Sequence, residues 1–128
     1  MLNGLKVLYL EDELLVAMDT AEYLETLGFE SVAVAYRLES AHQLMADTDF
    51  DLAVLDINVD RGQTSIALGR QLAQAGTRVI FASGNGGDAD KLRSDGFEFL
   101  DKPFSLPALA DKLQTAAKAE PQNSAPMN

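Results

Sequence analysis

The fold is decided by the stretch Leu52-Ala53-Val54-Leu55-Asp56, in which four apolar residues are followed directly by an acid. A short run without any polar residue is typical of a strand that is buried on both faces of a parallel sheet. Similar runs occur at residues 7–10, 32–35, 79–82 and 97–100, and only the last of them is interrupted by a charged residue. The sequence therefore predicts five strands, four of which are expected to be buried on both faces.

Helical periodicity fills the segments between these runs. Apolar residues recur with a period near 3.6 at residues 14–27, 38–45 and 66–75. Gly28 and Gly76 follow the first and third of these segments, where they are predicted to end the helices. A short polar helix is expected at residues 88–94, and a last helix is expected to begin near Ser105, a favourable N-cap residue. This alternation predicts an α/β fold with a doubly wound parallel sheet.

Length and charge limit the possible classes of function. The chain has 128 residues, which suits a single domain, and we expect this domain to span residues 1–118. Residues 119–128 are polar and contain proline, so they are predicted to form a disordered tail. The 20 acidic and 10 basic residues leave a formal charge of −10, which argues against binding to nucleic acid or to an anionic membrane surface.

Cysteine content and targeting signals narrow the classes further. The chain contains no cysteine, so disulfides, thiol catalysis and Cys-ligated metal sites are excluded. No apolar run approaches the roughly 18–20 residues that span a bilayer. The N-terminus lacks the basic region and the cleavage site of a signal peptide. We therefore expect a cytoplasmic protein.

Side chains capable of chemistry follow four of the five runs. Ligands of an open parallel sheet bind at the carboxyl ends of its strands, so the residues just beyond each run form the candidate site. They are Glu11, Asp12 and Glu13 after the first run, Asp56 after the third, Ser83 with Gly84-Asn85-Gly86-Gly87 after the fourth, and Lys102 after the fifth. We expect these residues to converge on one edge of the sheet.

Glu11, Asp12 and Asp56 together indicate a metal site. Two carboxylates about 4–5 Å apart repel each other by roughly 3–4 kcal/mol at an effective dielectric constant near 20. A cluster of three therefore favours a hard divalent cation such as Mg²⁺ among them. The alternative is that residues 11–13 form the acidic first turn of a helix, where the helix dipole stabilises them.

Asp56 is the candidate nucleophile for a phosphoryl group, because a carboxylate can form an aspartyl phosphate. Mg²⁺ and Lys102 would neutralise the charge on the transferring oxygens. Ser83 can donate a hydrogen bond to one of these oxygens. The backbone N–H groups of the glycines that follow Ser83 could also contact a phosphate, although these glycines are equally consistent with a flexible loop.

These residues, in this order, resemble the active site of the receiver domain of two-component response regulators. The resemblance covers roughly residues 4–118 and implies a CheY-like, flavodoxin-like sheet of strand order 2-1-3-4-5 with five helices. It implies Mg²⁺ ligation by Glu11, Asp12, Asp56 and the backbone carbonyl of Asn58, phosphorylation of Asp56, binding of phosphoryl oxygens by Ser83 and Lys102, and a conformational switch formed by Ser83 and Phe99. Receivers often have a cis peptide bond before the proline that corresponds to Pro103.

The resemblance also implies a function. We expect a stand-alone receiver that is a signalling domain rather than an enzyme, and that accepts its phosphoryl group from a histidine kinase or a histidine phosphotransfer protein. The segment 81–84 is similar to a Phe-Ala-Thr-Gly motif of a single-domain receiver subgroup. The signal would pass to an unknown downstream protein or along a phosphate relay, and the receiver would be a monomer or a weak dimer. Two departures are that Phe99 has no hydroxyl group and that residues 57–63 contain no proline.

Three alternatives remain open at this level. A degenerate receiver would act as a binding module without phosphorylation. A haloacid-dehalogenase-type phosphatase also uses a strand-end aspartate, but it carries a second Asp two positions later, where this chain has Asn58. A flavodoxin-like flavin binder shares the topology, but the acidic residues 11–13 would repel the phosphate of the flavin.

Overall fold

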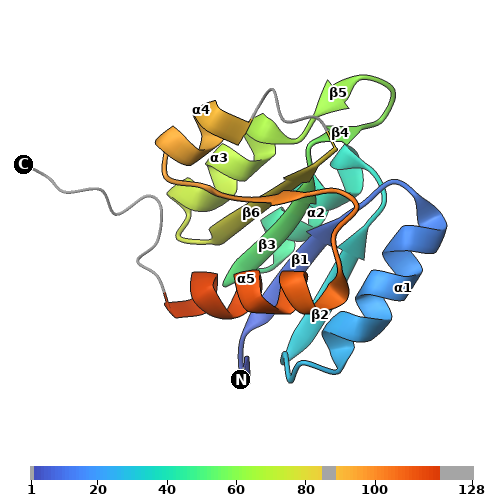
Figure 1. Ribbon diagram of the computed structural model, residues 1–128, viewed down its shortest axis with the longest axis vertical. Helices are drawn as coiled ribbons and strands as arrows, with labels where there is room; N and C mark the ends of the chain where they lie inside the picture. Colours follow the sequence, from blue (N-terminus) through green and yellow to red (C-terminus); the bar gives the residue numbers. More distant parts are fainter. Residues whose placement is uncertain (1, 85–88, 119–128) are drawn as a thin grey trace, which may run out of the picture.

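A five-stranded parallel sheet forms the centre of the molecule, in a computed structural model that describes residues 2–84 and 89–118 (Figure 1). The strands follow the order β2-β1-β3-β6-β7, so the predicted order 2-1-3-4-5 is confirmed. Their bounds are β1 Lys6–Leu10, β2 Ser31–Ala35, β3 Leu52–Asp56, β6 Arg78–Ser83 and β7 Glu98–Asp101. The labels β4 and β5 belong to a small hairpin outside this sheet.

Helices cover both faces of the sheet, as a doubly wound fold requires (Figure 1). Apolar side chains of α1 Leu14–Glu25 and α5 Leu106–Lys118 pack in one core layer, against one face of the sheet. The other face is covered by α2 Leu38–Asp47, α3 Ile66–Gln74 and α4 Ala89–Ser94. All five predicted helices are present, and the first residue of the predicted fourth helix, Asp88, lies outside the described residues.

Burial differs between the central strands and the edge strands. Every residue of β3 is buried, and β1 and β6 are buried except for their first residues. Val32, Ala33 and Val34 of β2 are only half-buried. The expectation that this run is buried on both faces was therefore wrong, because β2 lies at the edge of the sheet. At the other edge, β7 begins at Glu98, one residue later than predicted.

The helix termini follow the expected local rules. Gly76 has a φ of +100° directly after the C-cap of α3, which is the left-handed conformation that glycine adopts most easily. Gly28 has a φ of +96°, and a Cβ atom at this position would overlap the side chain of Asn3. The Oγ atom of Ser105 accepts a hydrogen bond of 3.2 Å from the N–H of Ala108, so Ser105 caps α5 as predicted.

The segment between β3 and α3 contains a hairpin that was not predicted from the sequence. Its strands are β4 Asn58–Val59 and β5 Gln63–Thr64, and they pair antiparallel. The sequence Asp60-Arg61-Gly62 at the tip has the composition of a turn, which is the one local signal for a hairpin here. Two strands of two residues are too short to produce an alternating pattern, so the sequence could not have revealed them.

Within residues 2–84 and 89–118, no helix is long and apolar enough to cross a membrane. The predicted tail, residues 119–128, lies outside the described part of the chain, as do Asn85, Gly86 and Gly87 of the predicted phosphate loop. The domain boundary at residue 118 stays a prediction.

Candidate functional site

The register of the sheet brings four strand ends to the same level. Leu10 of β1 pairs with Leu55 of β3, so the residues that follow them, Glu11 and Asp56, are neighbours. Asp56 in turn pairs with Ala82 of β6, one residue before Ser83. Parallel strands end at a common edge, and this is why residues far apart in the sequence meet here.

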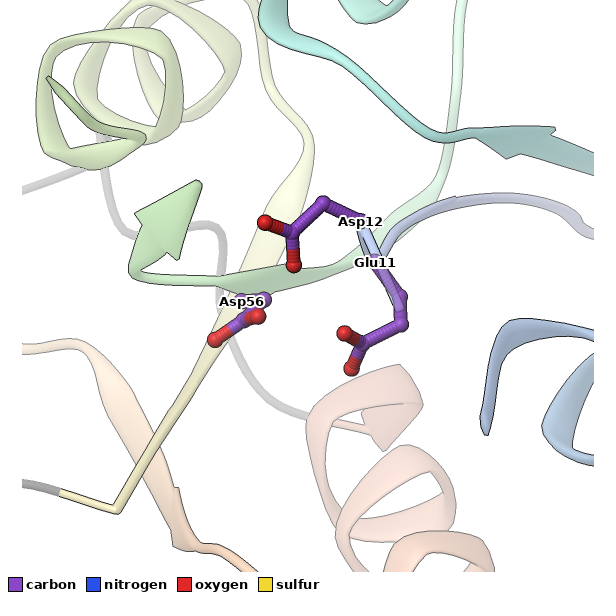
Figure 2. A group of neighbouring side chains, drawn as sticks. All are labelled: Glu11, Asp12 and Asp56. Carbon is purple, nitrogen blue, oxygen red and sulfur yellow. The ribbon is translucent and has the colours of Figure 1, made fainter. Parts of the chain in front are cut away.

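Three carboxylates converge at this edge, as Figure 2 shows. Glu11, Asp12 and Asp56 each offer a carboxylate oxygen that lies within 4.8 Å of the other two. Glu11 and Asp56 are buried, whereas Asp12 is exposed. The cluster is therefore open to solvent on the Asp12 side and closed on the side of the sheet.

The acidic residues after β1 do not form the first turn of a helix. Helix α1 begins at Leu14, so residues 11–13 precede it, and its first turn contains no acid. One carboxylate oxygen of Glu11 accepts a hydrogen bond of 3.0 Å from the N–H of Glu13. The alternative interpretation of this segment is therefore wrong, because the chain leaves β1 through a turn that directs the carboxylates of Glu11 and Asp12 toward Asp56.

Lys102 supplies a positive charge to the cluster. Its Nζ atom lies 2.8 Å from Oε1 of Glu11 and 3.3 Å from Oδ2 of Asp56. Its backbone N–H donates a 3.0 Å hydrogen bond to the carbonyl of Ser83, and the peptide bond between Lys102 and Pro103 is cis. Burial by itself lowers the pKa of Lys102, but its hydrogen bond to Glu11 and the two carboxylate charges outweigh burial and raise it.

The charge of Asp56 is only partly compensated. The pKa of Asp56 is raised to about 6. Burial raises it most and the charge of Glu11 raises it next, and together they outweigh Lys102, which lowers it. A divalent cation bound to these oxygens would remove the repulsion. The hard oxygen ligands, their spacing and the excess negative charge all fit Mg²⁺.

A cleft of about 650 Å³ opens beside Asp56, between α1 and the segment that follows β7. Its lining includes Thr20, Asp56, Lys102, Pro103, Phe104 and Leu106. Asp56 lines this cleft, although its side chain is only 9% exposed.

Tyr9 and Thr20 border the site, and sequence reasoning did not single them out. The hydroxyl of Tyr9 is buried beside the side chain of Thr20. Burial raises the pKa of Tyr9 most, the side chain of Thr20 opposes this, and the charges of Glu11 and Asp56 raise the pKa further. The one available signal was a tyrosine inside an otherwise aliphatic run.

The two predicted switch residues are both buried, and only Phe99 lies apart from the carboxylate cluster. Ser83 ends β6 and is 1% exposed, and Phe99 on β7 is 2% exposed within the core on the α3–α4 face. The guanidinium of Arg93 in α4 lies 5.1 Å from the centroid of the Phe99 ring. Of the predicted site residues, the structure thus gathers Glu11, Asp12, Asp56 and Lys102, places Ser83 and Asn58 beside them, and leaves Phe99 in the core.

A doubly wound sheet with three acids and a lysine at its carboxyl edge defines the class of CheY-like receivers. The family model described as "Response regulator receiver domain" matches residues 7–114. The chain belongs to this family. Receiver domains are signalling domains of two-component systems, they bind Mg²⁺ at an acidic pocket, and they interact with histidine kinases or phosphotransfer proteins. The phosphatase and flavin-binder alternatives find no support in this assignment.

Individual relatives agree with the family. The chain is 28% identical over 103 residues to the aerobic respiration control protein ArcA of Escherichia coli (strain K12). The matched region covers 77% of this chain and 42% of ArcA. The chain thus spans less than half the length of the curated relatives it matches.

Solved structures support the fold. A CheY-like receiver domain protein from Methanospirillum hungatei JF-1 superposes with a TM-score of 0.80 at 18% identity, covering 90% of this chain and 94% of that one. The receiver domain of the Francisella response regulator 1452 superposes with a TM-score of 0.75 at 24% identity. The match covers 90% of this chain and 98% of that one.

Proposed function

We propose that this receiver accepts a phosphoryl group on Asp56 from a phosphohistidine of a histidine kinase or a histidine phosphotransfer protein. The reaction depends on Mg²⁺ and takes place in the cytoplasm. The observation that carries the proposal is the position of the Asp56 carboxylate, which lies 3.3 Å from Lys102, within 4.8 Å of two other acids, and at the side of an open cleft.

The transfer replaces one bond to phosphorus by another. A carboxylate oxygen of Asp56 attacks the phosphorus atom, the P–N bond to the imidazole breaks, and the imidazole nitrogen leaves with the bonding electron pair. Glu11, Asp12, Asp56 and the carbonyl of Asn58 would hold Mg²⁺, which would supply charge neutralisation for the transferring oxygens. Lys102 exchanges its contact with the Asp56 carboxylate for a contact with a phosphoryl oxygen. Water later hydrolyses the acyl phosphate.

Phosphorylation would then change the surface through the two switch residues. The hydroxyl of Ser83 donates a hydrogen bond to a phosphoryl oxygen, and the Phe99 ring repacks in response. Phe99 lies under Arg93 of α4, so the change reaches the face formed by α4, β7 and α5. A downstream protein that binds this face, or a relay partner that removes the phosphate, receives the signal.

An exposed apolar patch on α1 supports a protein donor. Leu14, Leu15 and Met18 have exposed fractions of 56%, 77% and 55%, and they belong to the same helix that lines the cleft. A protein that places a histidine beside Asp56 must also cover the start of α1. We propose that the donor packs on this patch.

Mass spectrometry tests the acceptor directly. The chain is incubated with a small phosphodonor and Mg²⁺, and the intact mass is followed. We expect one phosphoryl group on the wild type, none on Asp56→Asn, and one on the matched control Asp51→Asn, which changes the aspartate at the other end of β3. An adduct that persists on Asp56→Asn contradicts the assignment. A wild type that never forms an adduct favours the degenerate receiver.

The patch on α1 has a separate test. We expect Leu15→Glu to slow transfer from a phosphorylated histidine kinase and to leave transfer from a small phosphodonor unchanged, because only a protein donor covers α1. Equal rates of transfer from the kinase to wild type and variant would show that the donor does not pack there.

A further inference from the structure

The tip of the β4–β5 hairpin is held in an unusual backbone conformation. Asp60, Arg61 and Gly62 have φ angles of +50°, +58° and +93°, so three successive residues are left-handed and two of them carry a side chain. Left-handed backbone is unfavourable for L-residues other than glycine, although asparagine and aspartate tolerate it better than most. Such a conformation persists only where contacts of the folded protein impose it.

One hydrogen bond connects this tip to another element. Oδ2 of Asp60 accepts a bond of 2.9 Å from the backbone N–H of Leu38, the first residue of α2. Arg37, at the N-cap position of α2, makes no capping hydrogen bond with its own side chain. Asp60 lies 22 positions further along the chain, yet it supplies the hydrogen-bond acceptor that an N-cap residue usually provides. This bond connects the hairpin to the N-terminus of α2.

The hairpin is tied at its base as well. The hydroxyl of Ser65 donates a bond of 2.8 Å to the carbonyl of Asp56, and the N–H of Ser65 donates one of 2.9 Å to the carbonyl of Ile57. The side chain of Val59 is buried in the core. The base of the segment is thus attached to the phosphorylation site, and its tip depends on Asp60.

The same hairpin lies beside Asp12, one of the proposed Mg²⁺ ligands. Asp12 lines a cavity of about 570 Å³ together with Asp60, Arg61 and Gln63 of the hairpin. Asn58, whose carbonyl is the proposed uncharged Mg²⁺ ligand, is the first residue of β4 and lies only two positions from Asp60. A carbonyl ligand carries no net charge, so its contribution depends on how well the backbone around it is held in place.

We propose that Asp60 is a positioning residue for the Mg²⁺ site, which it serves by fixing the hairpin that carries Asn58 to the N-terminus of α2. The inference rests on the proposed function, because it assumes that Mg²⁺ binds beside Asp12 and Asp56. Asp60 itself is not a ligand. Its effect on the metal passes through the bond to Leu38 and the backbone of β4.

Two variants of Asp60 separate the hydrogen bond from the charge, and a third variant elsewhere serves as the control. Asp60→Asn keeps an oxygen acceptor and tolerates left-handed backbone but removes the charge. Asp60→Gly relieves the strain and removes the acceptor. Asp51→Ala is the matched control, because Oδ2 of Asp51 accepts a similar bond of 2.8 Å from the N–H of Lys6 at the opposite edge of the sheet.

Mg²⁺ affinity is measured by calorimetric titration of the full chain at about 0.15 M salt, where screening weakens the direct effect of the Asp60 charge. We expect Asp60→Gly to weaken Mg²⁺ binding about tenfold, as is usual when a residue that orients a metal ligand is lost. Asp60→Asn and Asp51→Ala should stay close to wild type. Amide hydrogen exchange of Leu38 should accelerate in Asp60→Gly and not in Asp60→Asn.

Each remaining outcome has a definite meaning. If Asp60→Asn loses as much affinity as Asp60→Gly while Leu38 stays protected, the charge of Asp60 acts directly and the inference is overturned. Unchanged affinity in Asp60→Gly with Leu38 deprotected overturns it too, because the bond then breaks without consequence for the metal. A wild type that binds no Mg²⁺ contradicts the proposed function instead.

Discussion

The two ends of β3 carry an aspartate each, in opposite surroundings. Asp51, just before the strand, accepts a hydrogen bond of 2.8 Å from the N–H of Lys6. Beside it, the hydroxyl of Thr77 donates a bond of 2.8 Å to the carbonyl of Phe50. Asp56, at the other end, faces two more carboxylates. Asp51 and Thr77 at the first end thus have neutral backbone partners, whereas three carboxylates are gathered at the second.

The lysines at the amino and carboxyl ends of the strands differ in the same way. Lys6 lies 3.9 Å from Glu30, and both side chains are largely exposed. Lys102 is 23% exposed and contacts two buried acids at once. At the amino ends of the strands, Asp51 and Lys6 therefore each have one partner of opposite or complementary polarity. The carboxyl edge keeps an excess of negative charge, which favours the binding of a cation there.

The largest expected effect concerns Lys102. Lys102→Met should slow phosphorylation of Asp56 by a small phosphodonor about 100-fold or more, because a positioned donor to the transferring oxygens is lost. The rate of adduct formation, followed by intact mass, measures this effect. Lys6→Met at the other edge should react at the wild-type rate, and a similar loss in both variants would remove the distinction between the edges.

Asp56→Asn should stabilise the protein in EDTA near pH 7.5. The pKa of Asp56 is raised from 3.8 to about 6 in the folded chain, so the folded state keeps its proton between these values, where the unfolded chain has lost it. The stability contributed by this proton is fully present below pH 3.8 and is lost as pH rises through about 6. Removing the charge should therefore raise the free energy of unfolding by up to about 3 kcal/mol.

Urea unfolding of wild type and Asp56→Asn from pH 4 to pH 8 checks this expectation. The difference between the two should grow with pH and be largest above about pH 6, and a constant difference would show that the Asp56 charge is well accommodated. Asp51→Asn serves as the control, because it should not become more stable at any pH.

Asp51→Ala should destabilise the protein by about 1.5 kcal/mol, because it removes a partly buried, charge-assisted hydrogen bond to the backbone. Its phosphorylation rate should be unchanged. Urea unfolding at neutral pH measures the first quantity and intact mass the second. A gain in stability would mean that the aspartate at this end is also in unfavourable surroundings, contrary to the comparison.

The smallest effect is expected for Lys6→Met. An exposed ion pair contributes little, so the free energy of unfolding should change by less than about 0.5 kcal/mol. Chemical denaturation at low and high salt measures it. A loss as large as that of Asp51→Ala would indicate that the pair of Lys6 and Glu30 is a structural contact after all.

Much of the fold was predictable because its causes are local. The unbroken apolar run 52–55 predicted a central strand, and this strand is buried at every residue. The start of α5 was predictable from Ser105, because its side chain caps the helix locally. The run 32–35 has the same apolar composition as a central strand, yet it forms an edge strand. Composition alone could not show this, because burial of a strand depends on which neighbours it acquires.

The site was predictable in its members and not in its surroundings. Glu11, Asp56 and Lys102 each follow an apolar run, and the strand-end rule places such residues together. The bond from Leu38 to Asp60 has no signal in the sequence, since neither residue type requires a distant partner.

The sequence by itself determined the α/β alternation and which edge of the sheet carries the chemistry, because strand burial, helix capping and strand-end polarity are properties of short segments. Only the tertiary structure decided how strongly the pKa of Asp56 is raised, that Lys102 contacts two acids, and that the β4–β5 hairpin is fastened to α2. These features arise between segments that are distant in the sequence. Their energies depend on separation and burial, which exist only once the chain has folded.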